Sequence, residues 1–320
     1  MDAPAAFKAD PAFRADVLAG LSAPIPAVPA RWLYDRRGSE LFEDITRLSE
    51  YYLTRTEVAL LEAHCPEVAQ VAGTGDAVIE FGSGASVKTP ILLRAVRPSA
   101  YVPIDISGDF LLDAAAALQE EFPDLPVLPV EADFMRPIAL PQEVAAATRL
   151  GFFPGSTIGN LVPRTAVDLL RAMKDTLGEG SYLLIGMDRI KDEETLLAAY
   201  NDAEGVTAAF NLNLLHRINA ELGADISVDA FRHRAIWNDR MSRIEMHLEA
   251  LRDVAFEIDG SRFAFAAGST IHTENSHKYG VRDSRLLLRA AGWRVCREWT
   301  DADENFALIL AEAEPPRSAP

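Results

Sequence analysis

Short apolar runs alternate with helical patterns through the middle of the chain. Runs that are almost wholly apolar lie at Ala77–Phe81, Ala100–Ile104, Val127–Glu131, Thr148–Phe153 and Ser181–Met187. Between them, apolar residues recur every three or four positions, as in Thr89–Val96, Gly108–Glu121 and Arg164–Leu177. Repeated strand-then-helix units predict a doubly wound α/β sheet that is mainly parallel, with ligands bound at the carboxyl ends of its strands.

The pattern is different on both sides of this alternation. Helical spacing appears before it, at Asp10–Leu21, Ser39–Leu48 and Thr54–Ala63, where Thr54 and Glu57 have the spacing of a capping box. After it, 191–221 is mostly helical. Strand patterns follow at Arg243–Phe256 and Arg262–Ile271.

The end of the chain returns to the core pattern. A helix is expected at Ser284–Ala291, followed by two strands, Trp293–Thr300 and Phe306–Ala313, joined by a polar turn. We therefore expect a discontinuous substrate-binding lobe of α+β type, residues 1–56 and 190–279. The α/β core would comprise residues 57–189 and 280–320.

A glycine turn follows the first core strand. Gly82 and Gly84 are separated by one residue and precede the helix that begins near Thr89. A strand, a tight turn and a helix N-terminus in this order bind nucleotide-like ligands. The full dinucleotide fingerprint needs a third glycine, where this chain has Val87, and no P-loop lysine follows the first glycine at the required spacing.

Acidic residues end the next two strands. Asp105 comes about twenty residues after the glycines, where an acid binds ribose hydroxyls. Asp133-Phe134 follows the third strand. An acid at this place can accept a hydrogen bond from the adenine amine, and an aromatic side chain beside it can stack on the adenine ring. The fourth strand leads into a loop, 153–163, whose small residues and Asn160 lie where we expect a substrate to face the cofactor; a phosphate-binding turn is the rival interpretation of its glycine pair. The final hairpin favours a methyltransferase dependent on S-adenosylmethionine (SAM) over a nicotinamide dehydrogenase.

Composition excludes several function classes. The net charge of −17 over 320 residues argues against binding nucleic acid. No apolar run approaches the roughly 20 residues of a membrane span. Cys65 and Cys296 form no disulfide framework, and the first thirty residues lack the apolar core of a secretory signal, so we expect a cytoplasmic protein. The six histidines lack the H-x₃-H and H-E-x-x-H spacings, so no metal is expected.

Several longer motifs carry a resemblance to a known family. They are Tyr34-Asp35-x-x-Gly38-Ser39-x-Leu41-Phe42, Glu50-Tyr51-Tyr52-x-Thr54-Arg55-x-Glu57, Glu80-Phe81-Gly82-Ser83-Gly84-x-Ser86-x-Lys88-Thr89 and Gly155-Ser156-Thr157-Ile158-Gly159-Asn160. Together they resemble the histidine Nα-methyltransferases of ergothioneine biosynthesis, over roughly Arg31 to Ala313. The resemblance implies the SAM-dependent (class I) methyltransferase fold and three methyl transfers to the α-amine of L-histidine. The product is the betaine hercynine, reached through mono- and dimethyl intermediates.

The resemblance also implies residue roles. SAM would be held by Gly82, Lys88, Asp105, Asp133 and Phe134, with Lys88 at the methionine carboxylate. Tyr34 and Asn160 would act at the amine, Tyr34 helping the first proton to leave. The substrate would contact Tyr51, Asn160, Tyr200, Met246, Glu274 and Ser276. Of the adjacent Tyr51 and Tyr52, we expect Tyr51 to face the site.

Glu274 and Ser276 carry the prediction of histidine specificity. Residues two apart in a strand point to the same side, so each can meet one imidazole nitrogen. The alternatives are a methyltransferase of the same fold acting on another amino acid, a non-catalytic SAM-binding protein and a nicotinamide oxidoreductase. We expect a monomer with no nucleic-acid or membrane partner.

Overall fold

The computed structural model describes residues 10–84, 88–106 and 108–315. Ser86 and Val87 of the glycine motif therefore lie outside the described residues. The chain forms two compact units, unit 1 (Met1–Tyr51 and Asp192–Ser276) and unit 2 (Tyr52–Lys191 and His277–Pro320). The divisions expected from the sequence, after residues 56, 189 and 279, lie a few residues from these boundaries.

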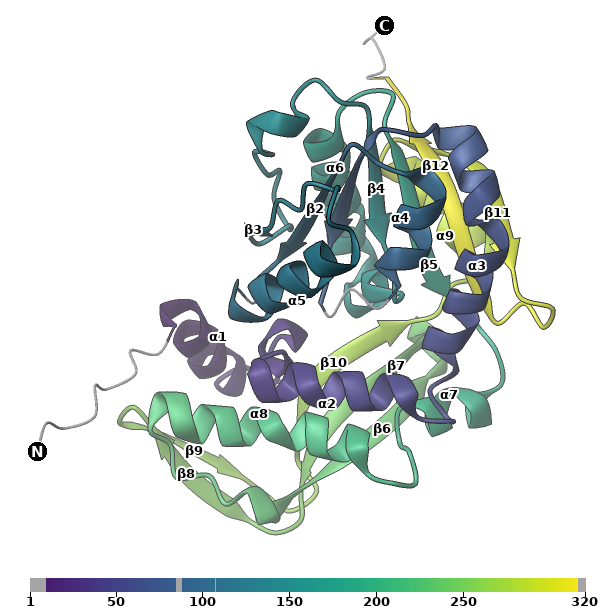
Figure 1. The fold of residues 1–320 in the computed structure, drawn as a ribbon. Coiled ribbons are helices and arrows are strands. Elements are labelled where there is room, and N and C mark those ends of the chain that lie inside the picture. Colours follow the sequence, from purple (N-terminus) through teal and green to yellow (C-terminus); the bar gives the residue numbers. More distant parts are fainter. Residues whose placement is uncertain (1–9, 85–87, 107, 316–320) are drawn as a thin grey trace, which may run out of the picture. The chain divides into compact units, whose positions relative to one another are not determined.

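Unit 2 is built on a seven-stranded sheet of order β11-β12-β5-β4-β1-β2-β3 (Figure 1). The strands are β1 Ala77–Phe81, β2 Ala100–Asp105, β3 Val130–Glu131, β4 Arg149–Phe153, β5 Tyr182–Asp188, β11 Trp293–Thr300 and β12 Phe306–Ala313. The first five are parallel, whereas β12 is antiparallel to both β5 and β11. The order reverses between β1 and β4, which confirms the doubly wound sheet with an antiparallel C-terminal strand.

Helices cover both faces of this sheet. They are α3 Tyr52–Ala72, α4 Thr89–Val96, α5 Gly108–Glu121, α6 Pro163–Leu177 and α9 Val281–Ala290, with short 3₁₀ turns η2 Gln142–Val144 and η3 Thr157–Asn160. In Figure 1, α3, α4 and α5 lie in front of the strands, and α6 and α9 lie behind them. All five residues of β1 are buried. Burial on both faces explains why these strands read as continuous apolar runs.

Unit 1 combines helices with two small antiparallel sheets. The helices are α1 Pro11–Leu21, α2 Arg36–Arg47, α7 Glu193–Ala199 and α8 Val206–Leu222, with 3₁₀ turns η1 Ala30–Leu33, η4 Val228–Ala230 and η5 Asp239–Met241. The strands are β6 Phe231–Asn238, β7 Arg243–Ala250, β8 Val254–Ile258, β9 Ser261–Phe265 and β10 Thr270–His277, whose last residue belongs to unit 2. One sheet has the order β10-β7-β6 and the other is the hairpin β8-β9.

Several details differ from the sequence prediction. Strand β6 was not predicted, and each of the two strands expected in 243–271 is divided in two. The predicted capping box at Thr54 is wrong, because α3 begins at Tyr52 and Thr54 lies inside it. No helix within 10–84, 88–106 or 108–315 is long and apolar enough to cross a membrane.

Candidate active site

The glycine turn of unit 2 is held against the neighbouring strand. Gly82 has φ +70°, and its N–H donates to the Ile104 carbonyl oxygen at 2.8 Å. A Cβ at this position would lie 3.4 Å from Cε1 of Phe134 and would also be strained by the positive φ. Glycine therefore allows the turn and leaves the space beside the Phe134 ring free of a side chain.

Asp105 is tied to the same turn. Its Oδ2 accepts from the Gly84 N–H at 3.1 Å, which joins the end of β2 to the loop after β1. Asp133 is exposed, and its Oδ1 accepts from the Met135 N–H at 3.0 Å. The structure thus brings Gly82, Asp105 and Phe134 to one end of the sheet, with Asp133 on the loop beside Phe134.

Lys88 forms an ion pair that the sequence did not predict. Its Nζ lies 2.5 Å from Oε2 of Glu57, a side chain on α3 that is fully buried. The Glu57 carboxylate also accepts from the Gly155 N–H, at 2.8 Å to Oε2. One buried carboxylate therefore fixes both the lysine before α4 and the loop after β4.

Glu80 provides a second buried carboxyl group beneath the turn. It is 1% exposed, and its Oε2 accepts from the hydroxyls of Thr89 and Tyr101, each at 2.6 Å. Burial raises the pKa of Glu80 to about 7, against the opposing effect of these two hydrogen bonds. This carboxyl group therefore keeps its proton to a higher pH than an exposed glutamate does.

A third buried charge network lies at the end of β5. Asp188 is fully buried and pairs with Nζ of Lys191 and Nζ of Lys278, each at 2.6 Å. Burial alone would raise the pKa of Asp188, but the two lysines outweigh it and lower the pKa. Tyr52 donates to the same carboxylate at 2.8 Å, and the Asp188 N–H donates to Oγ of Ser156 at 2.9 Å.

The loop that carries Asn160 is fixed from two sides. Asn160 ends η3, and a Cβ at the preceding Gly159 would lie 2.9 Å from the His277 carbonyl oxygen. Tyr279 donates from Oη to the Ile158 carbonyl oxygen at 3.3 Å. Glycine at 159 is therefore needed for the close approach of this loop to the chain at His277.

The tyrosines expected at the substrate cluster around Phe42 in unit 1. The Phe42 ring lies 5.5 Å from that of Tyr34 and 6.2 Å from that of Tyr51, both edge-on. Tyr51 in turn lies 6.2 Å from Tyr200. Tyr51 thus packs in the aromatic cluster of unit 1, whereas Tyr52 is bonded to Asp188 in unit 2.

The residues expected to recognise the imidazole lie in the same unit. Ser276 Oγ and Tyr200 Oη are 2.7 Å apart, and both side chains are buried. Glu274 is 8% exposed and Met246 is 2% exposed. Thr273 donates from Oγ1 to the Met246 carbonyl oxygen at 3.0 Å, which connects β10 to β7 at this point.

The expected site residues therefore fall into two groups. Unit 2 holds those expected to bind SAM, together with Asn160, and unit 1 holds those expected to contact the amino acid. Sequence reasoning missed Glu57, Glu80 and Phe42. Glu80 could have been noticed as a charged residue inside an apolar strand, and Phe42 as a ring at helical spacing from its neighbours; for Glu57 the sequence offers only the capping pattern.

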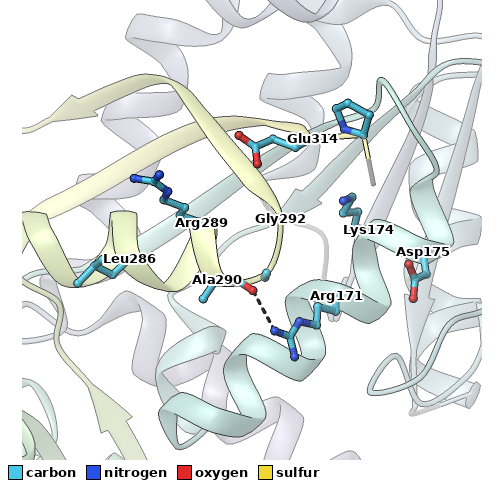
Figure 2. Close-up of a pocket in the computed structure, with 10 residues that line it drawn as sticks. Arg171, Lys174, Asp175, Leu286, Arg289, Ala290, Gly292 and Glu314 are labelled. Carbon is cyan, nitrogen blue, oxygen red and sulfur yellow. Dashed lines mark hydrogen bonds between the residues drawn. The ribbon is translucent and has the colours of Figure 1, made fainter. Parts of the chain in front are cut away.

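A surface pocket of unit 2 contains none of the expected residues (Figure 2). It lies between α6, α9 and the C-terminal end of β12, and has a volume of about 650 Å³. Arg171 donates from Nη2 to the Ala290 carbonyl oxygen at 3.0 Å across it. This pocket is distinct from the glycine turn and is not the candidate active site.

Comparison with known proteins shows the family to which the chain belongs. Residues 13–313 match the model of a family described as histidine-specific, SAM-dependent methyltransferases. The chain belongs to this family. It is 42% identical to the histidine N-alpha-methyltransferase of Mycolicibacterium smegmatis, over 96% of this chain and 97% of that protein.

Two fungal proteins that are also similar to this chain carry other names. Ergothioneine biosynthesis protein 1 of Neurospora crassa is 29% identical over 89% of this chain and 33% of the larger protein. The 4-dimethylallyltryptophan N-methyltransferase of Aspergillus fumigatus is 22% identical over 91% of each chain. As a member of this SAM-dependent methyltransferase family, the protein is an enzyme whose co-substrate is SAM.

Proposed function

We propose that this protein transfers three methyl groups in succession from SAM to the α-amine of L-histidine, giving hercynine, the first step of ergothioneine biosynthesis, in the cytoplasm. The observation that carries the proposal is the buried set in unit 1, Glu274 with the Ser276–Tyr200 hydroxyl pair. A carboxylate accepts from one imidazole N–H, and a hydroxyl either donates to or accepts from the other nitrogen. An indole has one N–H and no acceptor, so this pair suits histidine better than tryptophan.

The glycine turn supports the assignment of the SAM-binding residues. Gly82 leaves room beside Phe134 that a Cβ would fill, and Asp105 is held at the turn by the Gly84 N–H. Asp105 would bind the ribose hydroxyls, and Asp133 with Phe134 would meet the adenine. Lys88 would reach the methionine carboxylate, steadied by Glu57.

SAM would supply an electrophilic methyl group. A neutral amine would attack it in line with the S–CH₃ bond, which breaks with its electron pair leaving on the sulfur as S-adenosylhomocysteine. The protein's contribution is to hold that amine in line: Asn160 and Tyr200 would fix the amino and carboxylate groups, and Met246 would pack against the imidazole. Such positioning supplies about 7–11 kcal/mol in favourable cases. Tyr34 would help the first proton leave to water.

The substrate is tested with SAM and each of the twenty amino acids, followed by mass spectrometry. We expect histidine alone to gain three methyl groups. A mass gain on another amino acid with histidine unchanged would contradict the proposal, and tryptophan would then be the first alternative to follow. If, with SAM in excess and all the histidine converted, the mass gain stopped at one or two methyl groups, histidine would stand as the substrate but trimethylation would be refuted.

The recognition role is tested by Glu274→Gln. Loss of a charge-assisted hydrogen bond costs about 1.5–3 kcal/mol, so kcat/KM for histidine should fall about 10- to 100-fold. SAM affinity, measured by calorimetry, should stay unchanged. Glu257→Gln, an exposed position on β8, is the matched control and should change neither quantity. Lost SAM binding in Glu274→Gln would place Glu274 at the co-substrate instead.

A further inference from the structure

Three metal-binding side chains meet on the β10-β7-β6 sheet of unit 1. Glu245 and His247 lie on β7 and His272 lies on β10, and one ligand atom from each lies within 4.8 Å of the other two. The strands β7 and β10 are neighbours in the sheet. Glu245 and His247 are two residues apart, so they share one face of β7.

This face is opposite to the one covered by α8. Asn211 of α8 lies 3.0 Å from Nδ1 of His233, and His233 is paired in register with Leu248. Leu248 and Met246 therefore point toward α8, and His247 points to the other face. The cluster is thus separated by the strand itself from Met246, the residue proposed to pack against the substrate.

His272 already has the second contact that metal-binding imidazoles make. Nε2 of His272 lies 2.9 Å from the Glu274 carbonyl oxygen, which leaves Nδ1 to carry the lone pair. Nε2 of His247 lies 3.1 Å from Oε2 of Glu245. Nδ1 of His247 is buried without a hydrogen-bond partner among the described residues.

We propose that Glu245, His247 and His272 form a binding site for a divalent transition-metal ion such as Zn²⁺, with water completing its coordination. Zinc–nitrogen bonds of about 2.0–2.1 Å bring tetrahedral ligand atoms to about 3.3 Å from one another. The His247 and His272 rings are stacked, with centroids 4.8 Å apart and planes at 21°. Binding therefore requires the rings to turn so that their lone pairs converge.

The surrounding charges select the kind of metal. Oε1 of Glu245 already accepts from Asn238 and from Nε of Arg243, each at 2.8 Å, so its charge is shared with a guanidinium group. Arg234 also lies on this face, opposite His247 in register, and pairs with Glu249 at 3.3 Å. Hard cations such as Mg²⁺ and Ca²⁺ need several oxygen ligands and gain little here, whereas imidazole suits Zn²⁺, Ni²⁺ and Cu²⁺.

A metal at this site would join β7 to β10 through side chains. The His272 ring is bonded to the backbone of Glu274, so fixing that ring steadies the strand that carries the proposed imidazole-recognising residue. The inference does not depend on the proposed substrate, because the three ligands take no part in methyl transfer. The expected role is structural, and the site is defined by binding rather than by activity.

The test is a calorimetric titration of the full-length protein, free of any histidine tag, with ZnCl₂. We expect one equivalent to bind, and His247→Gln and His272→Gln each to weaken binding at least about tenfold. His216→Gln changes an exposed histidine on α8 of the same unit and should bind as the parent protein does. MgCl₂ at the same concentration should give no binding.

Thermal unfolding provides a second measurement that also checks folding. Zn²⁺ should raise the Tm of the parent protein and of His216→Gln, since a ligand of the native state stabilises it, but not the Tm of the double variant His247→Gln/His272→Gln. Circular dichroism confirms that each variant is folded before titration. The proposal is overturned if the parent protein binds Zn²⁺ no more tightly than the double variant, or binds Mg²⁺ as well.

Discussion

Different forces stabilise the glycine-turn region within unit 2 and the aromatic cluster within unit 1. Beneath the turn and the Asn160 loop lie buried ionised or titratable groups, Glu57 with Lys88, Glu80, and Asp188 with its two lysines. Around Phe42 lie rings packed edge to face. Buried ion pairs and hydrogen bonds thus fix the loops of unit 2, whereas the packing of aromatic rings fixes the cluster in unit 1.

This difference predicts different sensitivities. Substitutions that change charge without changing volume should change the stability of unit 2. Substitutions that change volume without changing charge should change ligand binding by unit 1. The three predictions that follow test this contrast, beginning with the largest expected effect.

Glu57→Gln should have the largest effect, on stability. It removes one partner of a buried ion pair and leaves Lys88, whose side chain is 15% exposed, without its counter-charge. Removing one partner of a buried pair costs about 3–5 kcal/mol. Urea unfolding should show this loss, and SAM should bind more weakly because Lys88 and the Gly155 loop lose their common anchor.

Glu62→Gln is the matched control for this change. Glu62 lies on the same helix, α3, and is exposed, so its amide should leave both unfolding and SAM affinity as they are. If Glu57→Gln has the same urea midpoint of unfolding as the parent protein and binds SAM equally well, buried charge is not what anchors these loops.

Glu80 should make stability depend on pH. Its pKa is raised by burial to about 7 from 4.5, so between these values the folded state holds a proton that the unfolded state has lost. The free energy of unfolding should therefore fall as pH rises from 4.5 to 7, by about 3 kcal/mol from this group. Glu80→Gln should lack this part of the pH profile and should gain stability relative to the parent protein at pH 8.

The comparison is a pair of urea unfolding profiles at pH 5 and pH 8. Glu120→Gln, exposed on α5, supplies a control that should follow the parent at both values. A Glu80→Gln variant whose stability falls between pH 5 and 8 as much as the parent's would show that Glu80 is ionised in the folded protein throughout.

The core of unit 2 could be predicted from sequence, because its strands are buried on both faces. Strands β1 and β12 have the bounds that the apolar runs predict. Only two residues of the third expected strand form β3, at the edge of the sheet, where pairing rather than composition sets the length. Strand β6 was missed because its residues are mostly half-buried and include Arg232, His233 and Arg234.

The side-chain partners of the site could not be predicted. The spacing of Thr54 and Glu57 is that of a helix cap. In the structure, however, Glu57 is a buried ion-pair partner, because the loop after β4 and the lysine before α4 both contact α3. Likewise, motif searches for metal sites look along one segment. Glu245 and His247 are joined by His272 from the neighbouring strand, a relation that only the sheet order shows.

Phe42→Leu tests the unit 1 side of the contrast and should have the smallest effect. The substitution keeps an apolar side chain but removes the ring that packs against Tyr34 and Tyr51. Cation–π attraction contributes roughly 0.5–2 kcal/mol, so loosening these rings should weaken binding of N,N-dimethylhistidine about 2- to 30-fold. Histidine, whose amine carries no methyl groups, should be affected less. Calorimetry of both ligands measures the ratio, with Phe256→Leu in the β8-β9 hairpin as the control, and an equal loss for both would mean that the cluster shapes the cavity without favouring the methylated amine.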